Sequence, residues 1–356
     1  MKKNLLYQKI VDLKRIDAKD ARYLWKHFSW QEITELGWKV RCKKHNPDRV
    51  SYTMFNLVNY TNYCKIGCSF CSFKNETGNG KGYTLSIKEV FAKIDIGLKA
   101  GADQLLLQGG VNTGLTADYY LDLLHSIKSE YGIHIRGFSP VEIIQIQEKL
   151  GMSLKHTLIA LKEAGLDSVP GAGAEILNRR MRAKLSPKKI SPGMWKKVML
   201  TCHELGLYGS ANIVFGSDET FSDILSHLIL LRDIQDKFCG FKSFVAWTFQ
   251  KRTKDFFIRT VRPDEYLKLL AFCRIFLDNI PNIETSLLVI GKEIGSLALR
   301  AGANDINSVV IEENVLESFG ISSEKEALEF IKNAGFKPFR RDFNLVEVPI
   351  GKSVKN

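Results

Sequence analysis

The sequence predicts an α/β protein, a (β/α)8 barrel of the TIM type with an N-terminal helical lead-in. From about residue 51 onward, short apolar strands alternate with longer amphipathic helices roughly eight times, which is the pattern of a parallel βαβ architecture. The chain has 356 residues, and barrels of this kind reach such a length as a single domain. The informative motifs also fall after predicted strands, where the active sites of these barrels lie. These observations favour a closed barrel over an open sheet.

The lead-in is predicted to be helical. Apolar residues between Leu5 and Leu13 have roughly helical spacing, and residues 17–27 and 30–43 continue the pattern. No linker-like break divides the rest of the chain. We expect an N-terminal extension, a barrel core, and a C-terminal helix and tail that pack on the barrel, at residues 1–50, 51–322 and 323–356.

Strands and helices follow in regular order through the core. Ser86 followed by Glu89 is a capping-box arrangement, which predicts that a helix begins there. The predicted strands are 55–59, 104–108, 133–138, 168–169, 209–215, 243–249, 284–289 and 308–311. The predicted helices are 86–97, 118–130, 140–150, 153–164, 194–204, 222–238, 264–279, one that ends at Leu299, and 324–334.

The composition indicates a cytoplasmic protein. No apolar run approaches the roughly 18 residues that span a membrane, and seven cysteines, four of them scattered singly, do not form a disulfide framework. The net charge is +12, with Lys and Arg spread along the whole chain. The densest basic stretch, residues 179–184 followed by Lys188 and Lys189, either forms a solvated helix face or helps to hold carboxylates. Nucleic acid is an unlikely partner, because no stacking-aromatic RNA motif accompanies the charge.

Cys64, Cys68 and Cys71 form a C-x3-C-x2-C motif. Three thiolates can hold three irons of a four-iron, four-sulfur cluster and leave the fourth iron open, whereas clusters used only for electron transfer normally have four cysteines. A structural zinc site is one alternative, but it needs four ligands and no other cysteine or histidine lies nearby in the sequence. Three buried, inert thiols are the other alternative.

The cysteine spacing resembles the signature of radical S-adenosylmethionine enzymes, which have the barrel fold predicted above. In that family the open iron takes the amino and carboxylate groups of S-adenosylmethionine. The resemblance implies that the three cysteines bind a [4Fe-4S] cluster and that Phe70 flanks the adenine. It also implies that Gly109 and Gly110, at the end of the strand 104–108, meet the methionine end, where a missing side chain permits close approach.

Further segments resemble the dehypoxanthine futalosine cyclases of the futalosine route to menaquinone. These segments include residues 107–112, 138–143, 163–168, 170–177, 247–250, 277–283 and 302–305. Aminofutalosine synthases and the deazaflavin-cofactor radical synthases are the alternatives within the superfamily. Gln108, the triplet Phe138-Ser139-Pro140 and the strand end Trp247-Thr248-Phe249-Gln250 favour the cyclases. A non-catalytic metal-binding or nucleic-acid-binding protein is the alternative of a different class.

The resemblance implies a small carboxylate substrate, dehypoxanthine futalosine, and an electron donor such as flavodoxin or ferredoxin. A 5′-deoxyadenosyl radical would abstract a ribose hydrogen, and the sugar radical would then add to the benzoate ring. The residues implied to contact S-adenosylmethionine are Phe70, Gln108, Gly109, Gly110, Ser139 and Glu175. Ser139 is equally well read as a helix cap before Pro140.

The remaining implied site residues are polar groups at strand ends. Glu175 would contact the cofactor or substrate, or else form a buried pair with Arg180 or Arg182. Asn212 and Gln250 would line the substrate pocket. Ser217 stands where the family commonly has a histidine, so Glu219 or a water must replace it if that histidine handles a proton or a substrate group. Glu175 and Glu219 are the candidate catalytic residues.

Overall fold

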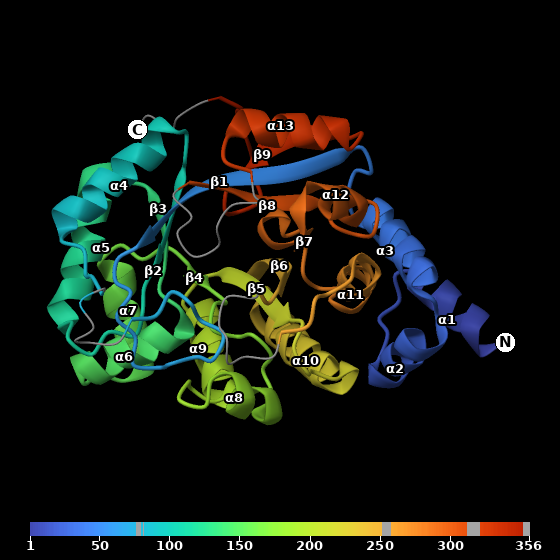
Figure 1. The fold of residues 1–356 in the computed structure, drawn as a ribbon, viewed down its shortest axis with the longest axis horizontal. Coiled ribbons are helices and arrows are strands. Elements are labelled where there is room, and N and C mark those ends of the chain that lie inside the picture. The colour runs from blue at the N-terminus through green and yellow to red at the C-terminus, as the bar shows by residue number, and fades with distance from the viewer. Residues whose placement is uncertain (76–79, 81, 251–257, 312–320, 352–356) are drawn as a thin grey trace.

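The computed structural model describes residues 1–75, 80, 82–250, 258–311 and 321–351 (Figure 1). Eight strands lie at the centre: β1 (Arg49–Asn59), β2 (Gln104–Gln108), β3 (His134–Gly137), β4 (Val169–Pro170), β5 (Gly209–Phe215), β6 (Phe241–Thr248), β7 (Asn282–Glu284) and β8 (Asp305–Ile311). They pair in parallel in chain order, and β8 returns to β1. A single bridge between Arg136 and Ser168 joins β3 to β4. The predicted barrel is therefore confirmed; a single residue pair joins β3 to β4, and another joins β7 to β8.

Helices surround the strands, as Figure 1 shows. They are α4 (Ile87–Lys99), α5 (Ala117–Tyr131), α6 (Pro140–Leu150), α7 (Leu154–Glu163), α8 (Arg179–Leu185), α9 (Pro192–Glu204), α10 (Phe221–Phe238), α11 (Pro263–Phe276) and α12 (Leu287–Leu299). The capping box of Ser86 with Glu89 begins α4 as predicted. The prediction of a strand over 284–289 was wrong beyond Glu284, because a short apolar run does not distinguish a buried strand from a buried helix. Helix α8 contains residues 179–184, for which a solvated helix face was one of the two predicted alternatives.

The lead-in forms α1 (Lys2–Val11), α2 (Ala18–His27) and α3 (Trp30–Lys44). Helix α3 packs closely on the barrel: a Cβ at Gly37 would lie 2.3 Å from the carbonyl oxygen of Ala301. The buried Arg41 donates hydrogen bonds to the carbonyl oxygens of Ala303 and Arg49, at 2.7 and 2.9 Å. These contacts fasten the lead-in to the start of β1.

The C-terminal region contains α13 (Glu324–Asn333), β9 (Lys337–Arg341) and β10 (Glu347–Val348). The two strands were not predicted. Strand β9 pairs in parallel with the first residues of β1, and β10 pairs with β9. Arg341 is buried and forms ion pairs with Glu284 (3.1 Å) and Asp305 (2.5 Å). The tail thus supplies a cation to two buried carboxylates of β7 and β8; its residues 352–356 lie outside the described part of the chain.

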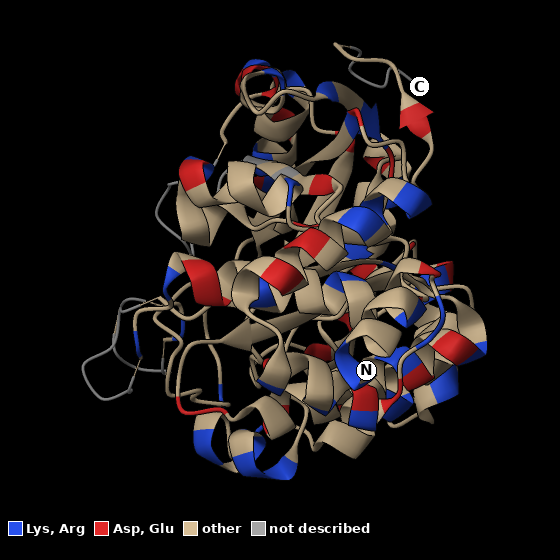
Figure 2. Cartoon of the chain, turned by 90° about the vertical axis from the view of Figure 1, so that its right-hand side faces the viewer, with Lys and Arg blue, Asp and Glu red and all other residues tan. Residues whose placement is uncertain are grey.

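Charged residues of both signs are distributed over the helices, strands and loops (Figure 2). Of the helices that the structure describes, none combines the length and the apolar character needed to cross a lipid bilayer.

Candidate functional site

The cysteine loop follows the C-terminal end of β1. Its backbone is held from three sides: Cys64 N–H donates to Asn75 (3.1 Å), Lys65 N–H to Val111 (3.0 Å), and Ser69 N–H to Leu185 at the end of α8 (3.1 Å). Buried apolar side chains, Ile66, Val111 and Val141, pack beneath it. The loop is therefore shaped by the protein before any ligand is considered.

The three cysteines are free thiols at the edge of the barrel mouth. Cys68 is buried, whereas Cys64 and Cys71 are partly exposed. Burial raises the pKa of the Cys71 thiol, and neighbouring Cys68 and Cys64 act in the same direction. Among the described residues, no three His, Cys, Asp or Glu side chains converge as the ligands of one metal ion would.

Gly109 and Gly110 let the end of β2 pass close to the cysteine loop. A Cβ at Gly110 would lie 2.1 Å from the carbonyl oxygen of Tyr63 and 2.9 Å from Cys64 Cβ, and a Cβ at Gly109 would enter the Tyr60 ring. Neither glycine has a positive φ. The paired glycines are thus required by close approach rather than by an unusual backbone conformation.

Glu142 lies under this region and was missed from the sequence. Its buried carboxylate accepts hydrogen bonds from Tyr60 Oη (2.6 Å), Gly109 N–H (2.9 Å) and Ser139 N–H (2.7 Å). Burial raises its pKa, although these hydrogen bonds oppose the shift. Ser139 caps α6 in a capping box with Glu142, so its reading as a helix cap is confirmed. The Ser-x-x-Glu spacing was the available signal for Glu142.

A cavity of about 380 Å³ opens at the barrel mouth beside the cysteine loop. Its wall includes Phe70 and Cys71 from the loop, and Gln108, Glu175, Asn212 and Gln250 from the set predicted to bind cofactor or substrate. The apolar part of the wall consists of Phe55, Leu57, Leu106, Val214, Trp247, Phe249, Leu288 and Val289. The structure therefore brings five of the predicted cofactor- and substrate-binding residues to one space. Gly109, Gly110 and Ser139 are not among the residues that line this cavity.

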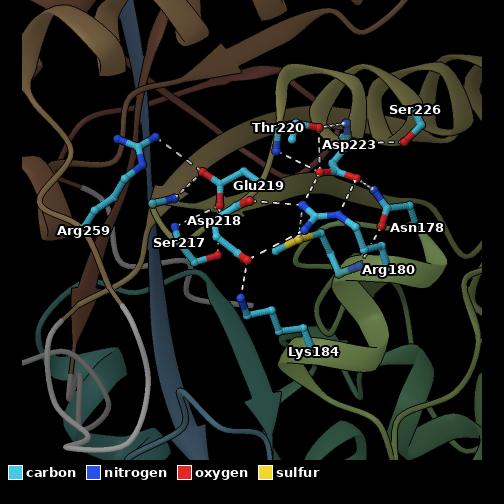
Figure 3. Close-up of polar contacts among 12 residues, drawn as sticks. Asn178, Arg180, Lys184, Ser217, Asp218, Glu219, Thr220, Asp223, Ser226 and Arg259 are labelled. Atoms are coloured by element: carbon cyan, nitrogen blue, oxygen red, sulfur yellow. Dashed lines mark hydrogen bonds and ion pairs between the residues drawn. The ribbon is translucent and has the colours of Figure 1, made fainter.

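Glu175 is held by two cations. Its carboxylate pairs with Arg182 Nη1 (2.9 Å) and Lys189 Nζ (2.8 Å), and all three side chains are buried. Burial alone would raise its pKa, but the two cations outweigh burial and lower it. The alternative of a buried pair is confirmed for Arg182. Arg180 instead binds Asp223, which is also hydrogen-bonded to Thr220 and Asn178 (Figure 3).

Glu219 binds its own turn. Its fully buried carboxylate accepts hydrogen bonds from Gly216 N–H, Ser217 N–H and Ser217 Oγ, each at 2.9 Å, and Arg259 approaches it at 3.5 Å (Figure 3). It is not part of the cavity wall. The neighbouring Asp218 forms ion pairs with Lys184 and Arg180 of α8 (Figure 3). The turn after β5 thus anchors helix α8, which supports the cysteine loop.

Comparisons with known proteins agree with this geometry. The Radical SAM superfamily model matches residues 58–231, and the CofH/MqnC C-terminal region matches residues 238–352. The chain is 36% identical over 341 residues to the cyclic dehypoxanthine futalosine synthase of Halalkalibacterium halodurans, covering 94% of this chain and 92% of that protein. It is also 34% identical to the 5-amino-6-(D-ribitylamino)uracil–L-tyrosine 4-hydroxyphenyl transferase of Methanococcoides burtonii, covering 87% and 90%. The crystal structure of methylornithine synthase shares the fold, with a TM-score of 0.71, 19% identity and coverage of 94% and 97%.

The superfamily match implies a [4Fe-4S] cluster and S-adenosylmethionine. The residues present fit both groups. The three cysteines lie on one pre-shaped loop, the sequence has no further cysteine between Cys42 and Cys64 or between Cys71 and Cys202, and the cavity wall continues from Cys71 and Phe70 into the barrel. A ligand on an open iron would thus lie next to any substrate bound in the barrel.

Proposed function

Because the chain belongs to the radical S-adenosylmethionine superfamily and carries a CofH/MqnC C-terminal region, we propose that it is a cyclic dehypoxanthine futalosine synthase. The observation that carries the proposal is the end-to-end match to a relative of that name, combined with one cavity shared by the cysteine loop and the barrel interior. When bound, the cluster and S-adenosylmethionine supply a 5′-deoxyadenosyl radical that removes a hydrogen atom from the ribose of the substrate.

The protein's own contribution is positioning. Reacting atoms must be held roughly 3–3.5 Å apart, and a cavity of limited size achieves this by restricting the poses of the substrate. The apolar wall, including Trp247 and Leu106, suits an aromatic ring, while Asn212 and Gln250 offer amide groups to sugar hydroxyls. The same wall excludes water, which protects a radical from side reactions.

Charge at the site also fits a ligand that carries a carboxylate. Glu175 is neutralised by Arg182 and Lys189, so the buried group as a whole is positive rather than negative. Cofactor binding by Phe70, Gln108, Gly109, Gly110 and Glu175 remains part of the proposal. Glu219 enters it as a residue that shapes the turn after β5, because its carboxylate is already occupied.

A second candidate is the 4-hydroxyphenyl transferase activity. A relative of that name is nearly as similar to this chain, so the choice of substrate is not decided by identity alone. Two sequence features favour the cyclase over an aminofutalosine synthase: Gln108-Gly109-Gly110-Val111 has no histidine after the paired glycines, and Trp247-Thr248-Phe249-Gln250 at the end of β6 differs from the Leu-Ala-Phe-His that is more usual in that synthase. The choice between cyclase and transferase is made by product analysis.

The test offers both substrate sets to anaerobically reconstituted, dithionite-reduced protein with S-adenosylmethionine. One reaction contains dehypoxanthine futalosine, and the other contains 5-amino-6-(D-ribitylamino)uracil with tyrosine. Mass spectrometry should find 5′-deoxyadenosine together with the cyclised product in the first reaction alone. Product in the second reaction alone would replace the cyclase with the transferase. Absence of 5′-deoxyadenosine in both, from iron-loaded protein, would reject radical chemistry for this chain.

A further inference from the structure

Lys189 is a buried cation beside the cysteine loop. Only 11% of its side chain is exposed, and its Nζ lies 5.6 Å from the centre of the Phe70 ring. Phe70 lies between the two ligand cysteines Cys68 and Cys71 in the sequence. Burial lowers the pKa of Lys189, but nearby Glu175 and then Cys68, as a thiolate, raise it. Lys189 is therefore coupled to the cysteine loop in two ways: its ammonium group lies over the Phe70 ring, and it interacts electrostatically with Cys68.

The buried group around Lys189 carries an excess positive charge. Arg182 and Lys189 contribute two positive charges, and Glu175 is the carboxylate that both of them bind. A charge in a poorly solvated region acts over a longer distance than one in water, because little solvent screens it. Lys188, next in sequence, is exposed and has no ion pair among the described residues, so water screens its charge.

We propose that Lys189 sets the reduction potential of the iron–sulfur cluster by placing this excess charge against the cysteine loop. Reduction adds one electron, supplied by a one-electron donor, and makes the cluster more negative. A nearby buried cation stabilises the reduced form relative to the oxidised form, and net charge around a cluster is one of the factors that set its potential. The inference goes beyond the proposed function, because it does not depend on which substrate is used.

Three isosteric or near-isosteric variants test the proposal. Lys189→Gln removes one positive charge from the group, Glu175→Gln removes its negative charge, and Lys188→Gln makes the same change as the first variant on an exposed neighbour. Each reconstituted protein is titrated with dithionite without S-adenosylmethionine, and the reduced cluster is followed by electron paramagnetic resonance. Iron and sulfide contents are measured on the same samples.

The expected result is a shift in opposite directions. Lys189→Gln should make the midpoint potential more negative, Glu175→Gln should make it more positive, and Lys188→Gln should leave it unchanged. General damage to the loop would not shift the potential in opposite directions for substitutions of two residues that bind each other. Equal potentials in Lys189→Gln and the unaltered protein, or shifts of the same sign in the first two variants, would overturn the proposal. If Lys189→Gln does not assemble the cluster, Glu175→Gln decides alone: a positive shift supports the proposal and any other result rejects it.

Discussion

Substitution of Gly110 by alanine is the sharpest test of how the cysteine loop is supported. The added methyl group would lie 2.1 Å from the carbonyl oxygen of Tyr63, so the loop or the end of β2 must move by about 1 Å to reach the shortest separations seen in real structures. The obstacle is backbone, which cannot rotate away as a side chain can. Overpacking of this kind costs about 1–3 kcal/mol. In a chain of 356 residues that cost lowers the melting temperature by only about 1–4 °C.

We therefore expect Gly110→Ala to stay folded and to lose its cluster. The same 1 Å displacement falls on Cys64, whose Cβ would lie 2.9 Å from the new methyl group, and ligand positions must be held to about 0.5 Å. The assay compares iron content and cluster absorbance after reconstitution with the melting curve. Gly114→Ala is the matched control on the same loop, since its Cβ would meet Asn112 Oδ1 at a tolerable 3.3 Å. Full iron loading of Gly110→Ala would refute the close-approach argument.

Three further outcomes follow from contacts described above. Burial raises the pKa of Asp223, but hydrogen bonds from Arg180 and Thr220 outweigh it and lower the pKa to about 2. The carboxylate therefore stabilises the fold by about 2 kcal/mol above the ordinary Asp pKa, and this contribution is lost as the pH falls toward 2. In Asp223→Asn the free energy of unfolding in urea should depend less on pH between pH 4 and 2, and an unchanged pH dependence would contradict this. Arg341→Met should lower the free energy of unfolding in urea by about 3–5 kcal/mol, because it leaves two buried carboxylates without their cation. The control Arg262→Met, which breaks an exposed ion pair, should lower it by less than about 1 kcal/mol. Equal losses in the two variants would show that burial of the ion pair does not matter here. Under the proposed function, Asn212→Ala should raise KM about tenfold with normal iron content, since one lost hydrogen bond is worth about 1.4 kcal/mol; an unchanged KM would remove this residue from the substrate site.

The barrel could be predicted because its pattern is local. Strands β2 and β5 have the predicted bounds, since each is a short apolar run that ends at glycine or a polar turn. The cysteine motif and the paired glycines were also visible as residue types at fixed spacing. The structure then adds why the glycines are needed, which depends on the distance to Tyr63 and not on the glycines themselves.

The parts that were missed depend on contacts between distant segments. Strand β9 exists because residues near 337 pair with the start of β1, and no local pattern reveals such a partner. Lys189 binds Glu175 across 14 positions, with helix α8 between the two residues, and the sequence offered the holding of carboxylates by this basic stretch only as one of two alternatives. The sequence supported the pair with Arg182, seven positions from Glu175, only as one of two options.

The pairing of β1 with β8 and β9 has a consequence for synthesis of the protein. Arg49 faces Lys337 in the finished sheet, 288 positions later in the chain. At about 5–20 residues per second, the ribosome needs roughly 15–60 s to deliver that partner. During this time the edge of the first strand that will pair with β8 and β9 has no partner, although the strand is almost wholly buried in the native barrel. The earliest strand to emerge is therefore the one most in need of a chaperone or of temporary cover by the lead-in helices.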